Sequence, residues 1–235
     1  MRGALDVLAA RCSAVLACAA VLAAGCADQP TRLTQPDPAP RFARAGEGAG
    51  PPQSVAFYSA RDGNNEIYLM DPDGSGQTRV TVHPASDVEP DLSPNGQSLV
   101  FTSTRSGNAD IWLLDLRTGA LVNLTNSPAA DGWARWSPNG QQIAFHSNRD
   151  GNFEIYVLDV RTGALTRVTT YAGVDQYPEW SPNGKTLALR RDMDVWTLEL
   201  RTGELTRLTT HPALDQMAAW SPNGQQLAFM TNTEQ

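Results

Sequence analysis

The stretch WSPNGQQIAF, residues 136–145, decides the fold because its pattern recurs along the chain. Ser-Pro-Asn-Gly begins at Ser93, Ser137, Ser181 and Ser221, so successive copies start 44, 44 and 40 residues apart, and an apolar segment follows each copy. A repeat of about 40 to 50 residues is typical of propellers and related repeat folds. The repeat therefore predicts the architecture more firmly than it predicts the chemistry.

Each repeat alternates short apolar segments with turn residues. Pro suits the second position of a type I turn, and Asn and Gly suit the positions after it. Residues 142–147, 154–159 and 165–169 read as three strands, and residues 177–180 read as the inner strand of the next unit. Four short strands ended by turn residues describe one blade of a β-propeller, and no stretch has a long helical period. We expect an all-β fold.

The composition excludes several classes of protein. Of the 235 residues, 41% are hydrophobic and 18% are charged, an ordinary globular balance. The formal net charge of −7 argues against nucleic acid or anionic lipid as a purely electrostatic partner. Cys12, Cys18 and Cys26 all lie near the N-terminus, so the repeats have no disulfide framework.

Residues 1–25 read as a secretory signal. Arg2 and Arg11 precede an apolar run that is too short for a membrane span of about 20 residues. The LAAGC sequence at residues 22–26 resembles the bacterial lipobox, which implies that Cys26 becomes the lipidated first residue of the mature protein. The alternative is an ordinary secreted protein in which Cys26 is a free thiol.

Residues 26–52 read as the lipidated cysteine and a tether. Pro, Ala and Gly dominate this segment, which has too few apolar side chains to bury a core. Several acyl chains would hold such a protein stably at a membrane. By resemblance to the enterobacterial sorting rule, Ala27 after the cysteine favours the outer membrane over the inner membrane.

The repeat also identifies a family. The pattern WSPNGxxIAFxSxRDGNxEIYxxD, followed by Arg-Val-Thr or Arg-Leu-Thr, closely resembles the repeat of TolB-type, WD-like propellers and covers residues 53–235. This resemblance implies a periplasm-facing binding or scaffold propeller in envelope-integrity or transport assemblies. Most members have Asp where this chain has Asn in the turn, and both residues suit that position. The hairpin at residues 189–194 lacks the Asp-Gly-Asn turn, so we expect it to be tighter.

The expected strands do not divide into a whole number of four-stranded blades. Three strands precede three complete four-stranded units, and two strands follow them, which fits neither four nor five complete blades. We expect about four blades plus a partial fifth, in an arc that is open, truncated or completed by self-association. The alternative is a strained four-blade ring in which the last inner strand completes the first blade.

The start of each inner strand combines a fixed residue with variable ones. An Asp recurs at positions 87, 131, 175 and 215, and we expect it to cap the loop backbone between blades. The residues that follow it differ between repeats, and such variation beside a fixed framework is where a ligand or partner surface would lie. Trp and Tyr are common at binding hot spots. The candidate surface comprises Glu89, Trp133, Gln176, Tyr177, Gln216, Met217, His83 and His211, with inter-blade packing as the alternative for Trp133 and Tyr177.

Two metal hypotheses accompany this surface. Ring closure would bring His83 and His211 together, and some propeller-fold pectate-type lyases hold a metal with a histidine cluster; packing within the loops is the alternative. Oxygen side chains at positions i, i+2 and i+4 of the hairpins suit Ca²⁺. These weak calcium candidates are Asp62, Asn64 and Glu66, and Asp150, Asn152 and Glu154. The alternative is a turn held by side-chain hydrogen bonds, with the acids paired to Arg61, Arg105 or Arg149.

No catalytic signature stands out. The sequence has no Gly-x-Ser-x-Gly nucleophile elbow, no phosphate loop and no zinc helix. We expect a non-enzymatic, lipid-anchored protein that needs no cofactor and binds a protein partner in the bacterial cell envelope. The alternatives are a polysaccharide-binding or lyase-type propeller and a truncated remnant of a larger propeller.

Overall fold

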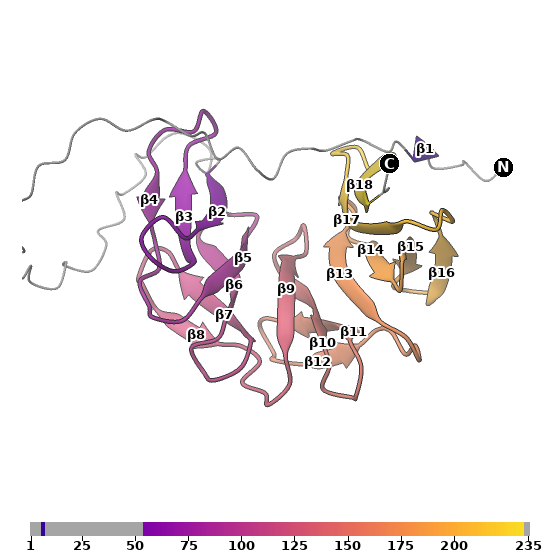
Figure 1. Ribbon diagram of the computed structural model, residues 1–235, viewed down its shortest axis with the longest axis horizontal. Coiled ribbons are helices and arrows are strands. Elements are labelled where there is room, and N and C mark those ends of the chain that lie inside the picture. Colours follow the sequence, from indigo (N-terminus) through magenta and orange to yellow (C-terminus); the bar gives the residue numbers. More distant parts are fainter. Residues whose placement is uncertain (1–5, 8–53, 233–235) are drawn as a thin grey trace, which may run out of the picture.

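Strands form all of the regular structure in the computed structural model, which describes residues 6–7 and 54–232 (Figure 1). Three sheets have four consecutive strands each, and their neighbouring strands are antiparallel. The strands of these sheets are β5 (Asp87–Leu92), β6 (Ser98–Ser103), β7 (Asp110–Asp115), β8 (Leu121–Asn123), β9 (Asp131–Trp136), β10 (Gln142–Ser147), β11 (Glu154–Asp159), β12 (Leu165–Arg167), β13 (Asp175–Trp180), β14 (Thr186–Arg191), β15 (Asp194–Glu199) and β16 (Glu204–Arg207). The four-stranded blade that the repeat predicts is confirmed.

The two end sheets have fewer strands. The first contains β2 (Val55–Ser59), β3 (Glu66–Met70) and β4 (Thr78–Arg79). The last contains β17 (Leu214–Trp220) and β18 (Gln226–Asn232), with the two-residue strand β1 (Asp6–Val7) parallel to β18. Because the tight turn after β17 makes β18 its neighbour, β17 does not complete the sheet of β2. The alternative of a closed four-blade ring is therefore wrong for the described residues.

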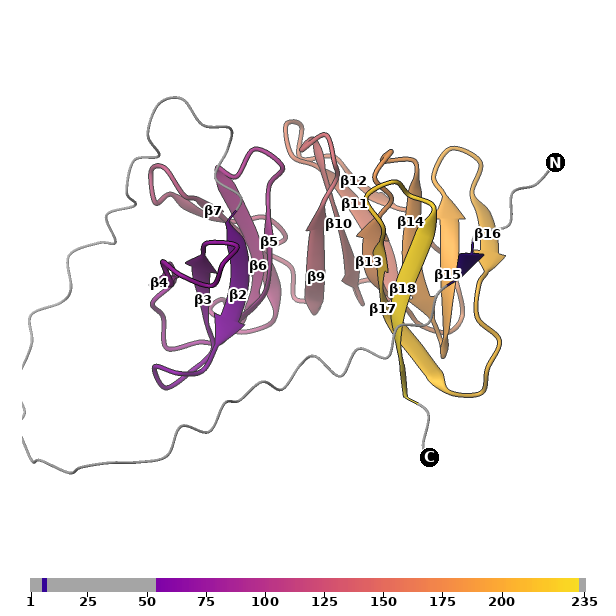
Figure 2. The same ribbon diagram turned by 90° about the horizontal axis from the view of Figure 1, so that it is seen from above.

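The sheets stand side by side in a curved row, and Figures 1 and 2 show this arc from two directions. The inner strands β5, β9, β13 and β17 make successive contacts, and the second strand of each sheet also contacts the inner strand of the next. Strand β2 contacts β5 in the same way. No strand pairing joins β2 to β17 or β18 among the described residues, so the arc is open.

The Ser-Pro-Asn-Gly turn is held by the same hydrogen bonds in each repeat. Ser137 Oγ donates to Asn139 Oδ1 at 2.7 Å, and this amide oxygen accepts from the Gln141 N–H at 3.0 Å. Gly140 N–H donates to Ser137 O at 2.8 Å with φ of +68°, which glycine adopts without steric cost. These contacts explain why the four residue types recur together.

The core lies between successive sheets. One cluster joins Val100 and Ile111 of the second sheet to Ile143, Phe145 and Tyr156 of the third. The next cluster joins the third sheet to the fourth in the same way. Each sheet therefore depends on its neighbours for burial, as expected for a repeat architecture.

The first sheet shows what happens without an inner strand. Tyr58 of β2 is 50% exposed, whereas Thr102 at the matching position of β6 is 6% exposed.

The predicted tight hairpin in the fourth sheet is confirmed, because only Asp192 and Met193 separate β14 from β15.

The N-terminal predictions fall mostly outside the described residues. Cys26, the tether at residues 26–52 and the signal at residues 1–25 lie there, apart from Asp6–Val7. Within residues 6–7 and 54–232, no helix has the length and apolarity needed to cross a bilayer.

Candidate functional site on the inner strands

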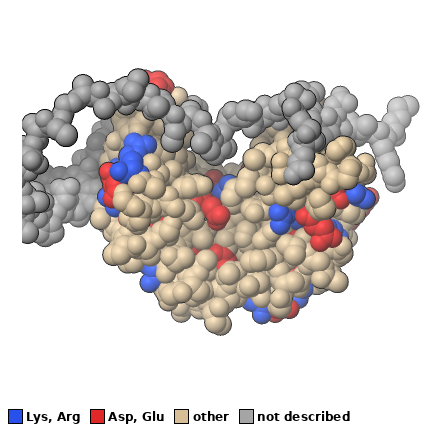
Figure 3. All heavy atoms as spheres, viewed as in Figure 1, with Lys and Arg blue, Asp and Glu red and all other residues tan. Residues whose placement is uncertain are grey.

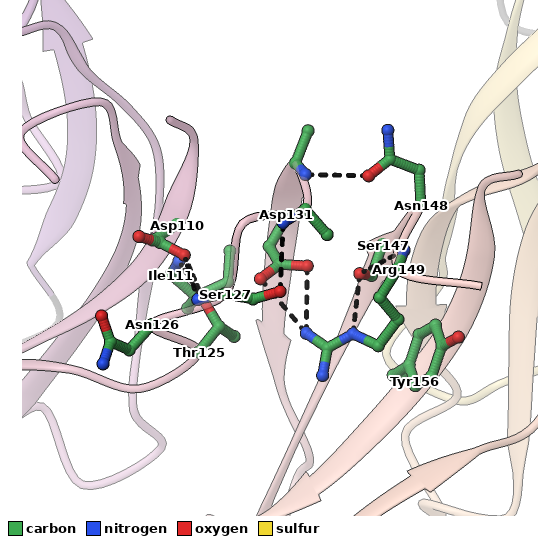
Figure 4. A network of polar contacts seen from close by, with 12 residues as sticks. Asp110, Ile111, Thr125, Asn126, Ser127, Asp131, Ser147, Asn148, Arg149 and Tyr156 are labelled. Carbon is green, nitrogen blue, oxygen red and sulfur yellow. Dashed lines mark hydrogen bonds and ion pairs between the residues drawn. The ribbon is translucent and has the colours of Figure 1, made fainter. Parts of the chain in front are cut away.

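A buried aspartate lies at or next to the start of each inner strand. In the second, third and fourth sheets its carboxylate pairs with an arginine of the same sheet, as Asp87–Arg105, Asp131–Arg149 and Asp175–Arg191, whereas Asp215 Oδ1 has no hydrogen-bond partner among the described residues. Asp131 accepts from Arg149 Nη2 at 3.1 and 3.2 Å, and Arg149 Nε donates to Ser147 Oγ at 2.8 Å (Figure 4). The link to the preceding sheet is made by the backbone, since Asp131 N–H donates to Ala109 O at 2.8 Å. The expectation that the aspartate side chain caps the loop between blades is wrong, because its carboxylate forms an ion pair with the arginine that follows the second strand.

The calcium candidates are occupied by protein hydrogen bonds. Glu154 Oε2 accepts from Thr169 Oγ1 at 2.5 Å, and its Oε1 accepts from Arg167 Nη2 at 2.9 Å and from Tyr171 N–H at 2.6 Å. Burial alone would raise the pKa of Glu154, but these hydrogen bonds outweigh it and lower the pKa. Asn152 Nδ2 donates to Tyr171 O at 2.8 Å, so an amide nitrogen faces the next loop.

The first sheet repeats this arrangement. Glu66 accepts from Arg79 Nη2 and His83 N–H, each at 2.8 Å, and Asn64 Nδ2 donates to His83 O at 2.8 Å. Asp62 and Asp150 accept from the hydroxyl groups of Tyr68 and Tyr156. The hairpin carboxylates therefore pair with Arg79 and Arg167, and the expected pairing with Arg61, Arg105 or Arg149 is wrong.

The variable positions of the candidate surface share an unusual backbone conformation. Each inner strand carries a bulge, in which two residues lie opposite one residue of the second strand. The first bulge residue has a positive φ in every inner strand: Glu89 (57°), Trp133 (55°), Tyr177 (56°) and Met217 (54°). None is glycine, and each such residue costs roughly 1 kcal/mol or more. The strained backbone conformation thus recurs at the positions where the side chains differ most between repeats.

Neighbouring bulge residues contact one another across the arc. Glu89 Oε2 accepts from Trp133 N–H at 2.9 Å, so the carboxylate of one sheet holds the bulge of the next. The rings of Trp133 and Tyr177 meet edge to face, with centroids 4.8 Å apart. The Arg190 guanidinium lies 4.9 Å from the Tyr177 ring centroid, which is within cation–π range. The structure thus brings Glu89, Trp133 and Tyr177 together, and contacts of this kind are also what the alternative of inter-blade packing predicts.

Two glutamine candidates meet at Arg190. Arg190 Nη1 donates to Gln216 Oε1 at 3.1 Å, and its Nη2 donates to Gln176 Oε1. Arg190 thus ties the fourth sheet to the fifth, and its buried Nε has no partner among the described residues. Met217 carries the bulge of β17 but makes no polar contact of this kind.

A charged group beside the bulge was missed by the sequence analysis. Arg135 Nε donates to Glu179 Oε2 at 3.1 Å, and the Arg135 guanidinium lies 4.8 Å from the Trp133 ring centroid. Asp91 Oδ2 accepts from Trp136 N–H at 2.7 Å. Asp91, Arg135 and Glu179 are matching residues of successive repeats, each two positions after the first bulge residue. Extending the comparison of repeats by two residues would have found them.

Burial perturbs these acids. The pKa of Asp91 is raised by burial, against the opposing effect of Arg135. The pKa of Glu179 is raised to about 7, first by burial and then by the charge of Asp91, while Arg135 opposes the shift. Figure 3 shows acidic side chains in the hollow between the arms of the arc.

His146 supports the aromatic pair from beneath. It is 8% exposed, and its ring lies edge to face with Tyr177 at 5.7 Å and with Phe153 at 5.1 Å. Burial, assisted by the charge of Arg190, lowers the pKa of His146 to about 3, so its ring is neutral. A Cβ on Gly132 would lie 2.9 Å from His146 Nε2, which explains the glycine at this position.

The other two histidines stay in their loops. His83 Nδ1 accepts from Ala85 N–H at 3.0 Å, and His211 Nδ1 accepts from Ala213 N–H at 3.2 Å. These contacts match the loop-packing alternative. The inner strands therefore present aromatic faces, arginines and carboxylates in one row, an arrangement suited to binding a partner.

Comparison with solved structures agrees with this fold. TolB from Acinetobacter baumannii superposes with a TM-score of 0.67 at 29% identity, over 74% of this chain and 45% of that one. A putative TolB from Agrobacterium tumefaciens gives 0.65 at 24% identity, over 77% and 71%. An oligogalacturonate lyase in complex with manganese gives 0.56 at 16% identity, over 77% and 56%, a likeness of fold alone.

Sequence comparison is more specific. Two relatives named Tol-Pal system protein TolB match over 43 residues: that of Geobacter sulfurreducens at 49% identity and that of Syntrophotalea carbinolica at 44%. The match covers 18% of this chain and 10% of each relative, so this chain matches only a small part of their length. The family described as the TolB beta propeller domain matches residues 31–116 and 93–194. The chain belongs to the TolB beta-propeller domain family.

Proposed function

We propose that this chain is a non-enzymatic binding propeller of the bacterial cell envelope that engages a protein partner through its inner strands. The observation that carries the proposal is the row of strained, non-glycine bulges, in which Glu89 accepts from the backbone N–H of Trp133 and the Trp133 ring packs against the Tyr177 ring. Backbone strain of this kind is retained where the surroundings hold it, and it clusters at functional sites. Family membership and the relatives named for the Tol-Pal system support an assembly with envelope proteins.

The proposed surface has the composition of a binding hot spot. Trp133 and Tyr177 are both partly buried, and Arg135 and Arg190 stack on their rings. Aromatic and arginine side chains carry much of the energy at protein interfaces. Because the rings are already held by His146 and by each other, Trp133 and Tyr177 would lose little side-chain entropy when a partner binds.

In-cell cross-linking and pull-down of the full-length chain would test the proposal. A Trp133→Ala/Tyr177→Ala pair should lose its cross-linked partner, whereas Val122→Ala on the exposed outer strand β8 should keep it. Thermal unfolding of the purified variants would establish that both remain folded. Recovery of the same partner by the folded double variant would refute this surface as the binding site.

The envelope location is a separate proposal with its own test. Lipid attachment at Cys26 would place residues 53–235 on the periplasmic side, with the outer membrane favoured. Labelling with radioactive palmitate should be lost in Cys26→Ser, and membrane fractionation should move that variant to the soluble fraction. Labelling of Cys26→Ser at the parent level would exclude this cysteine as the anchor.

The non-enzymatic part of the proposal can be challenged with uronate polymers. We expect no unsaturated product from the parent chain or from His83→Ala and His211→Ala. Unsaturated product that is formed by the parent and lost in these variants would show lyase activity and overturn the non-enzymatic proposal.

A further inference from the structure

A pocket of about 600 Å³ lies between the third and fourth sheets, away from the inner-strand surface. Its walls come from the start of β10, from β11, from β12 and the segment after it, from the turn that precedes β14, and from the end of β15 and the turn that follows. These segments lie at the end of the blades that carries the Ser-Pro-Asn-Gly turns, opposite the Asp131–Arg149 network. The pocket therefore belongs to a different face from the proposed partner surface.

Smaller side chains open the pocket at this interface. Val157 and Val168 line it and also pack in the core between these sheets, and the matching residues Leu113 and Leu124 of the second sheet pack against the preceding core cluster. Each valine is one methylene shorter than its leucine counterpart, and close-packed interiors register changes of that size. Val157 and Val168 are thus lining residues in which the third sheet departs from the second.

The mouth of the pocket carries two cationic side chains. Lys185 is the only lysine in the sequence, and the matching residues of the other turns are Gln97, Gln141 and Gln225. Arg201 lines the same opening, and neither cation takes part in an ion pair between described residues. Leu200 N–H donates to Lys185 O at 3.0 Å, which fixes the lysine beside the apolar Leu200.

Glu199 is the one acidic residue among those that line the pocket, and its carboxylate hydrogen-bonds to the backbone of its own loop. Glu199 Oε2 accepts from the backbone N–H groups of Arg201 at 2.9 Å and Thr202 at 3.3 Å. The pocket thus offers two cations above an apolar floor, a combination that suits a ligand with one carboxylate and one apolar group. Pockets of this volume accept such ligands.

We propose that this pocket captures the C-terminus of a partner polypeptide that ends in an aliphatic residue. The terminal carboxylate meets Lys185 and Arg201, and the aliphatic side chain lies against Val157 and Val168. Capture of a terminal carboxylate is a recurring mode of peptide recognition. The site is independent of the inner-strand proposal, because no lining residue belongs to β5, β9, β13 or β17.

Fluorescence anisotropy with the full-length chain and a labelled Ala-Ala-Ala-Leu peptide tests the proposal. The peptide with a free carboxylate should bind at least tenfold more tightly than its C-terminal amide, and more tightly than hexanoate in competition. Lys185→Gln should weaken binding at least fivefold, since it restores the residue of the other turns, and Lys185→Arg should retain binding. The Val157→Leu/Val168→Leu pair should abolish binding by filling the pocket.

Gln97→Lys is the matched control, because it places a lysine in the corresponding turn of the second sheet, none of whose residues lines the pocket. It should leave peptide affinity unchanged. Equal binding of the amide, binding of hexanoate as tight as the peptide, no binding of the peptide at all, or full affinity in Lys185→Gln would each overturn the proposal. Unfolding curves for the variants would confirm that the comparison is made between folded proteins.

Discussion

Two oppositely perturbed groups on the inner strands should give the folded chain an unusual pH dependence. The pKa of buried His146 is lowered from 6.5 to about 3. Below about pH 6.5 the imidazole is therefore protonated in the unfolded chain but still neutral in the folded chain. Linkage then requires stability to fall as pH decreases from 7 to 5. At 1.36 kcal/mol per pKa unit, the loss over this range is about 2 kcal/mol.

Glu179 acts in the opposite direction. Its pKa is raised from 4.5 to about 7, so the folded chain retains a proton that the unfolded chain releases. Stability contributed by this group is present at pH 5 and falls as pH rises to 7, by at most about 2 kcal/mol because 31% of the side chain is exposed. The two contributions nearly cancel in the parent chain.

Single substitutions should expose each contribution. We expect His146→Thr, which has the residue of the matching strand, to lose about 2 kcal/mol of stability relative to the parent as pH rises from 5 to 7. Glu179→Gln should gain a similar amount over the same range. Urea unfolding followed by tryptophan fluorescence at both pH values measures these differences. An identical pH dependence in all three proteins would refute the assignment of these protonation states.

Three further predictions follow from the described contacts. Gly132→Ala should destabilise the chain by about 1 to 3 kcal/mol, because the new methyl group would press on His146; unchanged urea unfolding would contradict this. Asp131→Ala should cost about 3 to 5 kcal/mol, since Arg149 would be left without its carboxylate, and thermal unfolding would reveal whether another acid compensates. EDTA should leave the thermal midpoint unchanged, because Glu66 and Glu154 already accept from protein donors; a lowered midpoint restored by Ca²⁺ would revive the calcium alternative.

The strands could be predicted from the sequence because their signals are local. The turn Ser137–Gly140 is held by contacts within five residues, so its residue types alone mark where a strand ends. The predicted spans 142–147 and 154–159 match β10 and β11. The inner strand was predicted to begin at Tyr177 but begins at Asp175, because the bulge at Tyr177 interrupts the alternation that marks a strand.

The partners of charged residues could not be predicted in the same way. Arg149 lies closer in sequence to Glu154 than to Asp131, yet it pairs with Asp131 because β9 and β10 are adjacent in the sheet. The meeting of Arg135 with Glu179 depends on how two sheets pack, and they are 44 residues apart. Contacts of this kind are set by the curvature of the arc, which the repeat pattern does not contain.

The repeats separate the parts of the chain that maintain the fold from those that can specify a ligand. The Ser-Pro-Asn-Gly turns make similar contacts in four sheets, and Asp87, Asp131 and Asp175 pair with arginines in the same way, so these residues do not distinguish one of those sheets from another. The differences are concentrated at the bulges around Trp133 and Tyr177 and at the pocket around Lys185. The bulges and the pocket lie on different faces of the arc, and each costs stability, through backbone strain at the bulges and through lost packing at the pocket. We therefore infer two separate binding surfaces rather than a single one.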